Sequence, residues 1–513
     1  MKVFNIISVL TIAIILVLGC NCHNGKWKGE CSDAHDIGTI EIEQVEYNAL
    51  KVYLRIETEP HMDAYIQYWE AQDSSKIYYS PLSQDNRIHE IMLVQLTPAT
   101  QYKFNIVVQN SCCKTFSKTY DFKTKNPTWV SYYKNTRGFS SKIFDGNFHF
   151  HSRNNPGHML IVDNNGNLNW YQKAPYNFKV SQYTSKNTFL GIISDDTLKY
   201  SSGKEIVEVD LYGQLVRNIK SGDEVIGNKI FHHEINYDKD GNLMVLTLED
   251  REFDLSSIGG SKKDTVTGDG ILILNTEGKK IWEWTVFDVL NPIEYKNILK
   301  EKHDWLHANS LFQDSVGNYL VSFRNLNQIW KINGKSGQIE WKLGGSDSDF
   351  NLNEDCKFYG QHHIRLDQQN DLVLLDNGNK FIKKGMKNKK LKQPFKLKNF
   401  KQLSREEKKK HFEKRNSQLN LNNSYSRLLK LRINEENQTV GLVQEVKFPI
   451  EYYTKSQGSA EFINDSIVMF CSTNNKRILF TDYEGNIKEV VPLEFGSYRA
   501  QYIPELYSTE YVK

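Results

Sequence analysis

The chain has 513 residues and a formal net charge of only +3, which argues against a dedicated nucleic-acid-binding protein. Its length suits two or three domains, or one large all-β unit with an appendage. Aromatic residues make up 12% of the chain, prolines number only 11 and no long helical periodicity is present, so the composition favours β-structure.

The N-terminus has the character of a targeting segment. Lys2 precedes an apolar run, Ile6–Leu18, that is shorter than the roughly 20 residues needed to span a bilayer. Gly19 and Cys20 follow, so residues 1–20 resemble a bacterial lipoprotein signal, which implies cleavage before Cys20 and lipidation of this cysteine. Cleavage without lipidation is the alternative. We expect a protein of the cell envelope that is lipid-anchored and faces the periplasm or the exterior.

The remaining cysteines say little about the fold. Six are left when Cys20 is set aside, and their uneven spacing matches no zinc-binding pattern. Disulfides can form outside the cytoplasm, but the sequence does not reveal which cysteines pair.

Residues 38–125 show the alternating pattern of a small β-sandwich, with short apolar strands separated by turns. Within this range, Leu96–Val108 (LTPATQYKFNIVV) resembles the tyrosine-corner strand of fibronectin type III domains, with Tyr102 at the corner. An unrelated seven-stranded sandwich is the alternative. Either domain would serve as a spacer or a dimerisation element.

From about Phe139 the chain repeats one pattern, namely an apolar strand, an Asp or Asn, a glycine turn and a second strand that often carries Trp. Six copies begin at Met159, Ile206, Ile271, Ile329, Leu428 and Ile478. Another hairpin precedes at least four of them. Four strands per repeat and six repeats predict a six-bladed β-propeller, which we expect over residues 129–513. A β-helix or an open solenoid would need shorter and more regular periods.

The hairpin His303–Ile332 carries polar residues at its open end. Counting outward from its turn places His307 across from Arg324, with Asn309 on the same face as His307. A histidine, an arginine and an amide at one hairpin end suggest an oxyanion site. The alternative for this hairpin alone is a solvated polar rim.

The repeat brings further histidines to the same level. Inner strands of a propeller line the central channel in parallel, so equivalent positions in different blades lie at one depth. Counted back from the turns of their hairpins, His233 in the third blade and His362 in the fifth share one register, and His307 lies in the corresponding stretch of the fourth. We therefore expect three imidazoles and Arg324 to converge at one mouth of the channel.

Two chemistries suit such a cluster. Three neutral histidines can hold a metal ion, but an arginine aimed at the same point opposes a cation and favours an anion. The pattern therefore favours a tetrahedral oxyanion, such as a sulfuryl or phosphoryl group, bound by Arg324 and two imidazoles while the third imidazole attacks it. We expect neither a metal ion nor a cofactor.

Three motifs, in this order on a six-bladed repeat, resemble the bacterial arylsulfotransferases that work without nucleotide sulfate donors. They are HHE (His232–Glu234), DWLHAN with SFRN (Asp304–Asn325) and GQHH with LLDNG (Gly360–Gly378). SRLLKL (Ser426–Leu431) and YRA (Tyr498–Ala500) also resemble the family. The resemblance covers the chain from about Trp129 onward, and family members similarly carry a small N-terminal β-sandwich.

The resemblance implies a ping-pong transfer of a sulfuryl group from an aryl sulfate donor to a phenolic acceptor through a sulfated histidine. The nucleophile of the family falls on His362. Its sulfuryl-binding and acid/base residues fall on His233, His307 and Arg324, with Asn309 as a further substrate contact.

The segment Asp376–Gly378 stands across the hairpin from His362, and we expect it to orient the nucleophile and fix its tautomer, with Asn377 as a further substrate contact. Both His232 and His362 have a histidine neighbour where the family pattern is looser. The sequence therefore leaves open which member of each pair faces the channel.

The range 380–415 inserts 16 Lys or Arg and only 3 Glu into the fifth blade. Ser404 and Glu407 form the pattern of a capping box at the start of a short helix. The insertion is either a solvated surface loop or a basic lid that recruits anionic donors or touches acidic polymers or lipid headgroups.

Two functions from other classes remain alternatives. One is a non-catalytic propeller that binds sulfated or other anionic glycans at the cell envelope. The other is a metal-dependent hydrolase or lyase on the same scaffold. The expected partners are an aryl sulfate donor, a phenolic acceptor and, through the lipid anchor, the membrane, but not nucleic acid. Monomer and homodimer both remain open.

Overall fold

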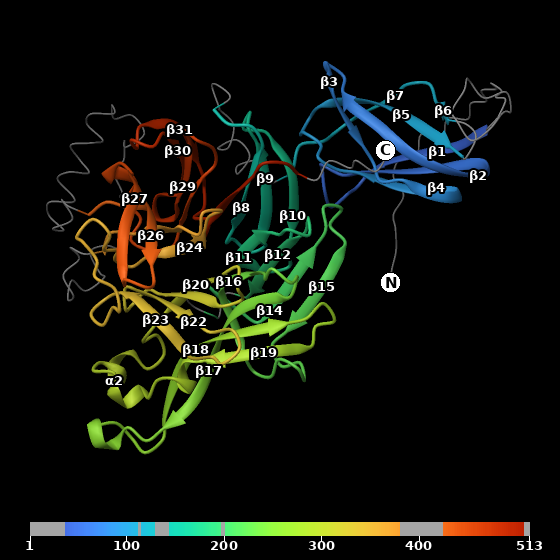
Figure 1. Ribbon diagram of the computed structural model, residues 1–513. Coiled ribbons are helices and arrows are strands. Elements are labelled where there is room, and N and C mark those ends of the chain that lie inside the picture. The colour runs from blue at the N-terminus through green and yellow to red at the C-terminus, as the bar shows by residue number, and fades with distance from the viewer. Residues whose placement is uncertain are drawn as a thin grey trace, which may run out of the picture.

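The computed structural model describes residues 36–110, 114–128, 143–195, 198, 201–379 and 424–506. In these residues the protein is all-β, as the sequence predicts, with a seven-stranded N-terminal unit beside a six-bladed propeller (Figure 1). The signal segment with Cys20 and the basic insertion lie outside the described residues. No helix in the described part of the chain is long and apolar enough to cross a membrane.

The N-terminal unit is organised by its longest strand. The first half of β2 pairs with β1 and β4, and the second half pairs with β3 and β5, so the sheet folds over as a half-barrel. Such a sheet is compatible with the predicted β-sandwich. Its strands are β1 (Asp36–Gln44), β2 (Val52–Glu70), β3 (Asp73–Tyr79), β4 (Ser83–Leu93), β5 (Gln101–Gln109), β6 (Lys114–Phe116) and β7 (Tyr120–Lys123).

Tyr102 forms the corner that the sequence predicts. Its side chain is fully buried, and its hydroxyl accepts a hydrogen bond from the backbone N–H of Thr97 at 2.9 Å. Because Thr97 lies five residues upstream, the bond ties β5 to the loop that leads into it, as in a fibronectin type III corner.

The propeller consists of six antiparallel blades, each a four-stranded sheet from the channel outward, with β13 (Ser202–Gly203) added to the third. The first blade has β32 (Ala500–Ile503), β8 (Asn147–Ser152), β9 (His158–Asp163) and β10 (Leu168–Lys173). The second has β11 (Asn177–Tyr183), β12 (Phe189–Ser194), β14 (Glu205–Val209) and β15 (Leu215–Lys220), and the third has β16 (Ile230–Tyr237), β17 (Leu243–Phe253), β18 (Asp264–Leu274) and β19 (Lys280–Thr285).

The remaining blades repeat this order. The fourth has β20 (Ala308–Gln313), β21 (Tyr319–Phe323), β22 (Gln328–Ile332) and β23 (Ile339–Gly344). The fifth has β24 (His362–Leu366), β25 (Leu372–Asp376), β26 (Arg427–Asn434) and β27 (Thr439–Lys447), and the sixth has β28 (Ser459–Phe462), β29 (Val468–Ser472), β30 (Arg477–Thr481) and β31 (Ile487–Pro492). Short helical turns occupy loops: η1 (Ser256–Ile258), η2 (Val286–Asp288), η3 (Pro292–Glu294), α2 (Ile298–Glu301), η6 (Ile450–Tyr452) and η7 (Thr473–Asn475).

A side-chain hydrogen-bond motif explains why the hairpin pattern recurs. In the first blade, Oδ1 of Asp163 accepts from the backbone N–H groups of Asn165 and Asn167 at 2.9 and 2.8 Å. Gly166 completes this turn with a φ of +77°, a conformation that glycine adopts without a steric penalty. The same pair of bonds recurs in turns of the third, fourth and sixth blades, at Asp238, Asp314 and Asp482.

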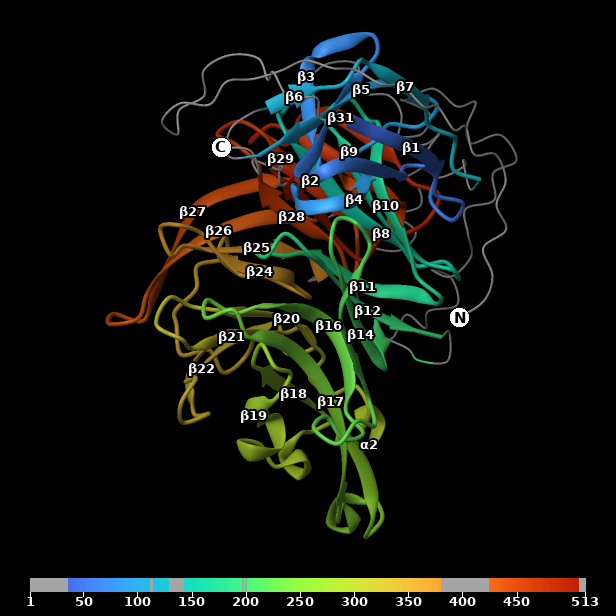
Figure 2. The ribbon, with the colours of Figure 1, turned by 90° about the vertical axis from the view of Figure 1, so that its right-hand side faces the viewer.

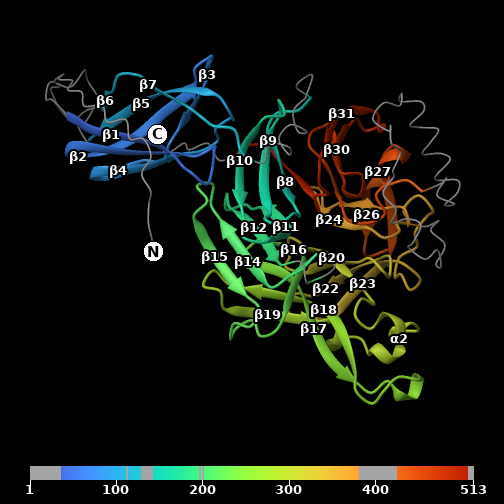
Figure 3. The ribbon, with the colours of Figure 1, turned by 180° about the vertical axis from the view of Figure 1, so that it is seen from behind.

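The ring closes through the C-terminal strand. β32 is the innermost strand of the first blade and pairs antiparallel with β8, from Ala500 opposite Phe150 to Ile503 opposite Asn147. The first blade therefore combines the beginning and the end of the propeller sequence. In Figures 2 and 3 the N-terminal sandwich lies beside the outer strands of this blade.

Buried polar contacts fix the sandwich to the propeller. Lys51 is buried, and its ammonium donates to the backbone carbonyl of Tyr212 at 2.5 Å. Asn48 donates to the backbone carbonyl of Tyr171 at 2.9 Å, and the hydroxyl of Tyr171 accepts from the N–H of Ala49 at 2.7 Å. Burial lowers the pKa of Lys51 to about 8.

A buried carboxylate joins several blades at the propeller axis. Glu234 on β16 accepts hydrogen bonds from Arg499 at 2.7 Å and from both terminal nitrogens of Arg365 at 3.1 and 3.2 Å. Arg365 lies on β24, and Arg499 immediately precedes the closing strand. The hydroxyl of Ser310 on β20 adds a bond at 3.0 Å. Burial acts to raise the pKa of Glu234, but the two guanidinium groups hold it below its usual value.

We expect Glu234→Gln to lower the free energy of unfolding by about 3–5 kcal/mol, because it leaves the buried guanidinium of Arg499 and the half-buried one of Arg365 without a counter-charge. Urea unfolding at pH 7 measures the change. Glu484→Gln, at an exposed turn, is the matched control and should stay within about 0.5 kcal/mol of the wild type. Equal unfolding free energies for the two variants would contradict the role given to Glu234.

Candidate active site

The histidines of the third, fourth and fifth blades lie where the inner strands depart from regular pairing. The cross-strand register shifts near the start of β16, β20 and β24. There His233, His307 and His363 take φ values of +55°, +60° and +52°, which cost a residue with a side chain about 1–3 kcal/mol each. Such bulges re-aim side chains, and at the mouth of a channel they determine which imidazoles meet.

His362 opens β24 and is held by three hydrogen bonds. Its Nδ1 lies 2.6 Å from Oδ1 of Asn377 and 3.0 Å from the backbone carbonyl of Gly360. Both partners can only accept, so Nδ1 carries the proton and Nε2 keeps its lone pair. The backbone N–H of Gln457 donates to Nε2 at 3.1 Å.

The orientation of Asn377 is fixed in turn. Its amide nitrogen donates to the backbone carbonyls of Thr454 and Gln457 at 2.8 and 3.0 Å. These bonds leave Oδ1 to face His362, so Asn377 sets both the direction of the imidazole and its tautomer.

Two buried amides lock the strand that carries His362. Gln361 donates to the hydroxyl of Ser322 at 3.0 Å and to the backbone carbonyl of Gln328 at 2.9 Å, both in the fourth blade. Asn309 donates to the backbone carbonyl of Gln361 at 2.8 Å, while its Oδ1 has no hydrogen-bond partner among the described residues. Asn309 thus acts on the position of His362.

His233 faces His307, with ring centroids 4.8 Å apart. Its Nδ1 lies 2.8 Å from Nδ1 of His232, whose Nε2 lies 3.1 Å from the backbone carbonyl of Thr247. Because a carbonyl only accepts, Nε2 of His232 carries a proton and Nδ1 of His232 accepts from His233. This relay leaves the lone pair of His233 on Nε2.

His307 is paired with a carboxylate. Its Nδ1 lies 2.6 Å from Oδ1 of Asp304, three residues earlier in the chain. An aspartate in this position accepts the Nδ1 proton and orients the ring. The backbone carbonyl of His307 accepts from the N–H of Arg324 at 3.0 Å, so the two residues face one another as the hairpin count predicts.

Arg324 is a largely buried cation with weak compensation. Its Nη1 donates to the side chain of Asn325 at 3.1 Å and its Nη2 to the backbone carbonyl of Lys455 at 3.4 Å, while Nε has no hydrogen-bond partner in the described part of the chain. Within those residues Arg324 makes no ion pair with a carboxylate. Burial lowers its pKa. A desolvated, uncompensated guanidinium favours an anionic ligand.

Electrostatics keep the imidazoles of His362, His233 and His232 neutral. Burial, followed by the charges of Arg324 and His307, holds the pKa of His362 well below its usual value. Burial, followed by His307 and His232, does the same for His233. Burial lowers the pKa of His232 to about 3. A neutral imidazole can accept a proton or attack an electrophile, which a protonated one cannot do.

The structure therefore brings His233, His307, His362 and Arg324 to one mouth of the channel. The two histidine pairs that the sequence left open are also resolved. His233 and His362 join the cluster. His232 instead contacts the backbone carbonyl of Thr247 in its own blade. Nδ1 of His363 lies 3.3 Å from the backbone carbonyl of Ala460 in the sixth blade.

The predicted register is wrong in one respect. His232 pairs with Leu246 and His362 with Leu375, each the fourth residue of its second strand, so pairing equates His362 with His232. His233 reaches the cluster because the bulge after His232 interrupts the alternation of the strand.

Three residues of the site were missed from the sequence. Asp304 could have been found from its spacing of three residues before His307. Tyr498 is buried with its ring 5.7 Å from that of His233, and its motif was noted without a role. Gln457 contributes a backbone group from the loop between β27 and β28, and no residue pattern signals such a contact.

The donor set of the site does not match a metal centre. In the described ranges, no group of three or more His, Cys, Asp or Glu residues is arranged to hold a metal ion. The nitrogens of His232 and His362 are instead engaged with carbonyl and amide groups.

The sequence model of the Arylsulfotransferase (ASST) family matches residues 133–495, which cover most of the propeller. The chain belongs to the arylsulfotransferase family. Membership supports a sulfotransferase activity in general. An aryl sulfate donor and a phenol acceptor are consistent with the family. No curated protein is significantly similar to this arylsulfotransferase-family chain in sequence.

Solved structures resemble this arylsulfotransferase-family protein only distantly. A protein of unknown function from Bacteroides caccae has 10% identity and a TM-score of 0.41, covering 71% of this chain and 100% of its own. One from Bacteroides thetaiotaomicron has 10% identity and a TM-score of 0.34, covering 87% and 96%. Virginiamycin B lyase from Staphylococcus aureus has 10% identity and a TM-score of 0.33, covering 69% and 87%. TM-scores this low carry no argument about function.

Acid should destabilise the protein through its buried histidines. Unfolded histidines bind protons near pH 6.5, whereas the folded ones do not, so the unfolded state binds more protons as the pH falls. We expect the free energy of unfolding to fall from pH 6.5 towards pH 4, by up to about 1.4 kcal/mol per pH unit for each histidine. Burial is the main cause of the lowered pKa in all eight buried histidines: His89, His149, His151, His158, His232, His233, His362 and His363.

Urea unfolding between pH 7 and pH 4.5 measures this slope. His149 lies outside the site, and burial lowers its pKa to about 4. His149→Gln should therefore reduce the slope of the unfolding free energy against pH by the contribution of one proton, about 1.4 kcal/mol per pH unit. Gln368→Asn, at an exposed turn and without a titratable group, is the matched control and should leave the slope unchanged. Identical slopes for the two variants would contradict the explanation.

Proposed function

We propose that the protein transfers a sulfuryl group from an aryl sulfate to a phenol through a covalent sulfohistidine at His362. The observation that carries this proposal is the pairing of a neutral imidazole, whose Nε2 lone pair is fixed by Asn377, with the uncompensated guanidinium of Arg324. A nucleophilic nitrogen beside an anion-binding cation suits attack on the sulfur of a sulfate ester.

In the first half-reaction, Nε2 of His362 attacks the sulfur, and the bond between sulfur and the aryl oxygen breaks. The phenolate leaves with that electron pair and takes a proton from His307, whose charged form Asp304 stabilises. In the second half-reaction the hydroxyl of the acceptor phenol gives its proton to His307, and its oxygen attacks the sulfur. The sulfur–nitrogen bond then breaks and restores neutral His362.

The remaining groups suit the stabilisation of the sulfuryl oxygens. Arg324 can offer its guanidinium N–H groups, and the N–H of Gln457 already points at Nε2 of His362 from 3.1 Å. When a sulfuryl group occupies Nε2, this N–H would turn to one of its oxygens. His233 adds a polar edge beside His307, while Asn309 and Asn377 hold the nucleophile in place.

We further propose that the mature protein is lipidated at Cys20 and faces the periplasm or the exterior, on the strength of the signal-like sequence alone. The mass of the N-terminal peptide tests this proposal, and an unmodified Cys20 would contradict it. We also propose that the protein forms a homodimer. The molar mass of the purified protein, measured by light scattering, tests this proposal, and the mass of a monomer would contradict it.

The function itself is tested by a two-phenol assay on the purified protein. A chromogenic aryl sulfate should release its phenol in catalytic amounts only when a second phenol is present, and that phenol should appear as its sulfate ester. Binding of sulfated glycans without release would instead indicate a non-catalytic propeller. Loss of activity with chelators would point to a metal-dependent hydrolase or lyase.

Arg324→Lys should keep the positive charge but lose the paired hydrogen-bond geometry of the guanidinium. We expect a loss of about 2–4 kcal/mol in transition-state stabilisation, measured as kcat/KM in the two-phenol assay, with little effect on folding. Arg432→Lys, in an exposed ion pair on β26, is the matched control and should retain activity. Wild-type turnover by Arg324→Lys would remove Arg324 from the site.

His362 should become sulfated when the protein meets donor alone. We expect one phenol released per active site and one sulfuryl group added to the peptide that contains His362, detected by a stopped assay and mass spectrometry. His362→Asn should abolish both signals, whereas His233→Asn should slow transfer and still accumulate label. Label on another residue, or a burst that survives in His362→Asn, would overturn the assignment.

A further inference from the structure

A second arginine occupies the position in the repeat that Arg324 occupies. Arg324 is the first residue after β21, the second strand of the fourth blade, and Asn377 holds the same place after β25 in the fifth. In the first blade the residue that follows the second strand, β8, is Arg153. Blades one and four are three apart in a ring of six, so Arg153 stands across the channel mouth from Arg324.

Arg153 is linked to the nucleophile by one residue. Its Nη1 donates to the side chain of Gln457 at 3.0 Å, and the backbone N–H of the same Gln457 donates to Nε2 of His362 at 3.1 Å. Arg153 makes no ion pair with a carboxylate among the described residues, and burial lowers its pKa. It is therefore a second desolvated cation next to the site, without a counter-charge of its own.

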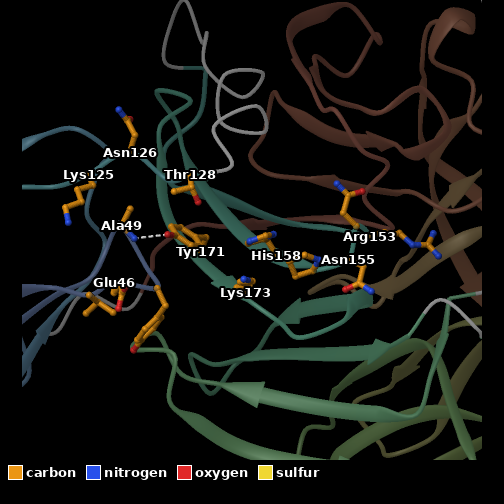
Figure 4. A pocket seen from close by; sticks show the side chains of 14 residues that line it. Glu46, Ala49, Lys125, Asn126, Thr128, Arg153, Asn155, His158, Tyr171 and Lys173 are labelled. Atoms are coloured by element: carbon orange, nitrogen blue, oxygen red, sulfur yellow. Dashed lines mark hydrogen bonds between the residues drawn. The ribbon is translucent and has the colours of Figure 1, made fainter. Parts of the chain in front are cut away.

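A cleft of about 920 Å³ leads from Arg153 to the N-terminal sandwich. In Figure 4 Glu46 and Lys125 lie at the sandwich end of the cleft and Arg153 at the propeller end, with Tyr171 and Lys173 on the wall between them. The volume falls in the usual range of small-molecule sites, about 300–1,000 Å³.

The cleft has a net positive charge. Among the described residues that line it are three cations, Arg153, Lys125 and Lys173, and one carboxylate, that of Glu46. Lys173 also contributes to lowering the pKa of His158, which burial and this charge bring to about 4. Tyr47, which is 71% exposed, supplies aromatic surface beside these charges, and the buried Tyr171 lies in the wall behind them. A planar molecule with an anionic end fits this combination.

We propose that this cleft binds a second anionic group, a carboxylate or a sulfate, on the aryl substrate whose phenolic end reaches His362, and that Arg153 determines this specificity. The proposal rests on the proposed sulfuryl transfer, which fixes where the phenolic end lies. It assigns the protein to aromatic substrates that carry a negative charge away from the reacting oxygen. Donor and acceptor share this chemistry, since in a ping-pong reaction each occupies the site in turn.

The test compares a charged substrate with its neutral ester. For the acceptor arm, 3-(4-hydroxyphenyl)propionate and its methyl ester each receive the sulfuryl group from 4-nitrophenyl sulfate. For the donor arm, the sulfate esters of the same two compounds supply it to phenol. We expect the wild type to favour the carboxylate about tenfold in kcat/KM in at least one arm, and the arm that shows the preference identifies the substrate bound there.

Arg153→Gln should remove this preference, and Lys173→Gln should reduce it. Lys335→Gln, at an exposed turn of the fourth blade, is the matched control and should keep it. Because Arg153 also contacts Gln457, the readout is the ratio between carboxylate and ester, which a general loss of activity does not change. A wild type without preference in either arm, or a preference that survives Arg153→Gln, would overturn the proposal.

A binding measurement separates this proposal from the proposed function. The Kd of 3-(4-hydroxyphenyl)propionate, measured by isothermal titration calorimetry without donor, should rise about tenfold in Arg153→Gln and stay unchanged in Lys335→Gln. If no phenol is sulfated by the wild type, the proposed function fails, and this comparison still decides whether the cleft binds the anion. Equal Kd values for wild type and Arg153→Gln would refute the cleft.

Discussion

The ion pair between Glu234 and its two arginines supports the position of His362 as well as the closure of the ring. Arg499, which neutralises Glu234, also donates to the backbone carbonyl of Asn309 at 2.9 Å. The amide of Asn309 donates to the carbonyl of Gln361, the residue before His362. One continuous set of hydrogen bonds therefore connects the charge at the axis with the strand that begins at His362. Burial makes each of these bonds costly to lose, and this cost explains how a site assembled from several blades can be rigid.

Burial has opposite outcomes for the imidazoles and for the guanidinium of the site. Imidazoles deep in the channel stay neutral because desolvation disfavours their charged forms, whereas a guanidinium keeps its charge under the same conditions. The site consequently combines the neutral imidazoles of His233 and His362 with a permanent cation, without a metal ligand set in the described residues. An anionic electrophile satisfies both features at once, since it neutralises the cation and meets the lone pair.

The fold was predictable because its information is local and repeated. An aspartate that caps its own turn and a glycine at positive φ specify each hairpin wherever they recur, and counting along a regular hairpin correctly set His307 against Arg324. Counting failed where a bulge breaks the period, as it does after His232, since no residue type marks the extra residue. Gln457 could not be predicted for a different reason. It acts through a backbone N–H, which any residue in that loop could supply.

The closure of the ring sets the order in which the site can be completed. Tyr498 and Arg499 lie directly before β32, the last strand of the described chain, and β32 pairs with β8, the first strand of the propeller. While the ribosome is still making these residues, Glu234 lacks one of its two guanidinium partners and the first blade lacks its innermost strand. The unfinished chain thus contains every imidazole of the site but neither the strand that closes the ring nor the arginine that joins that strand to Glu234.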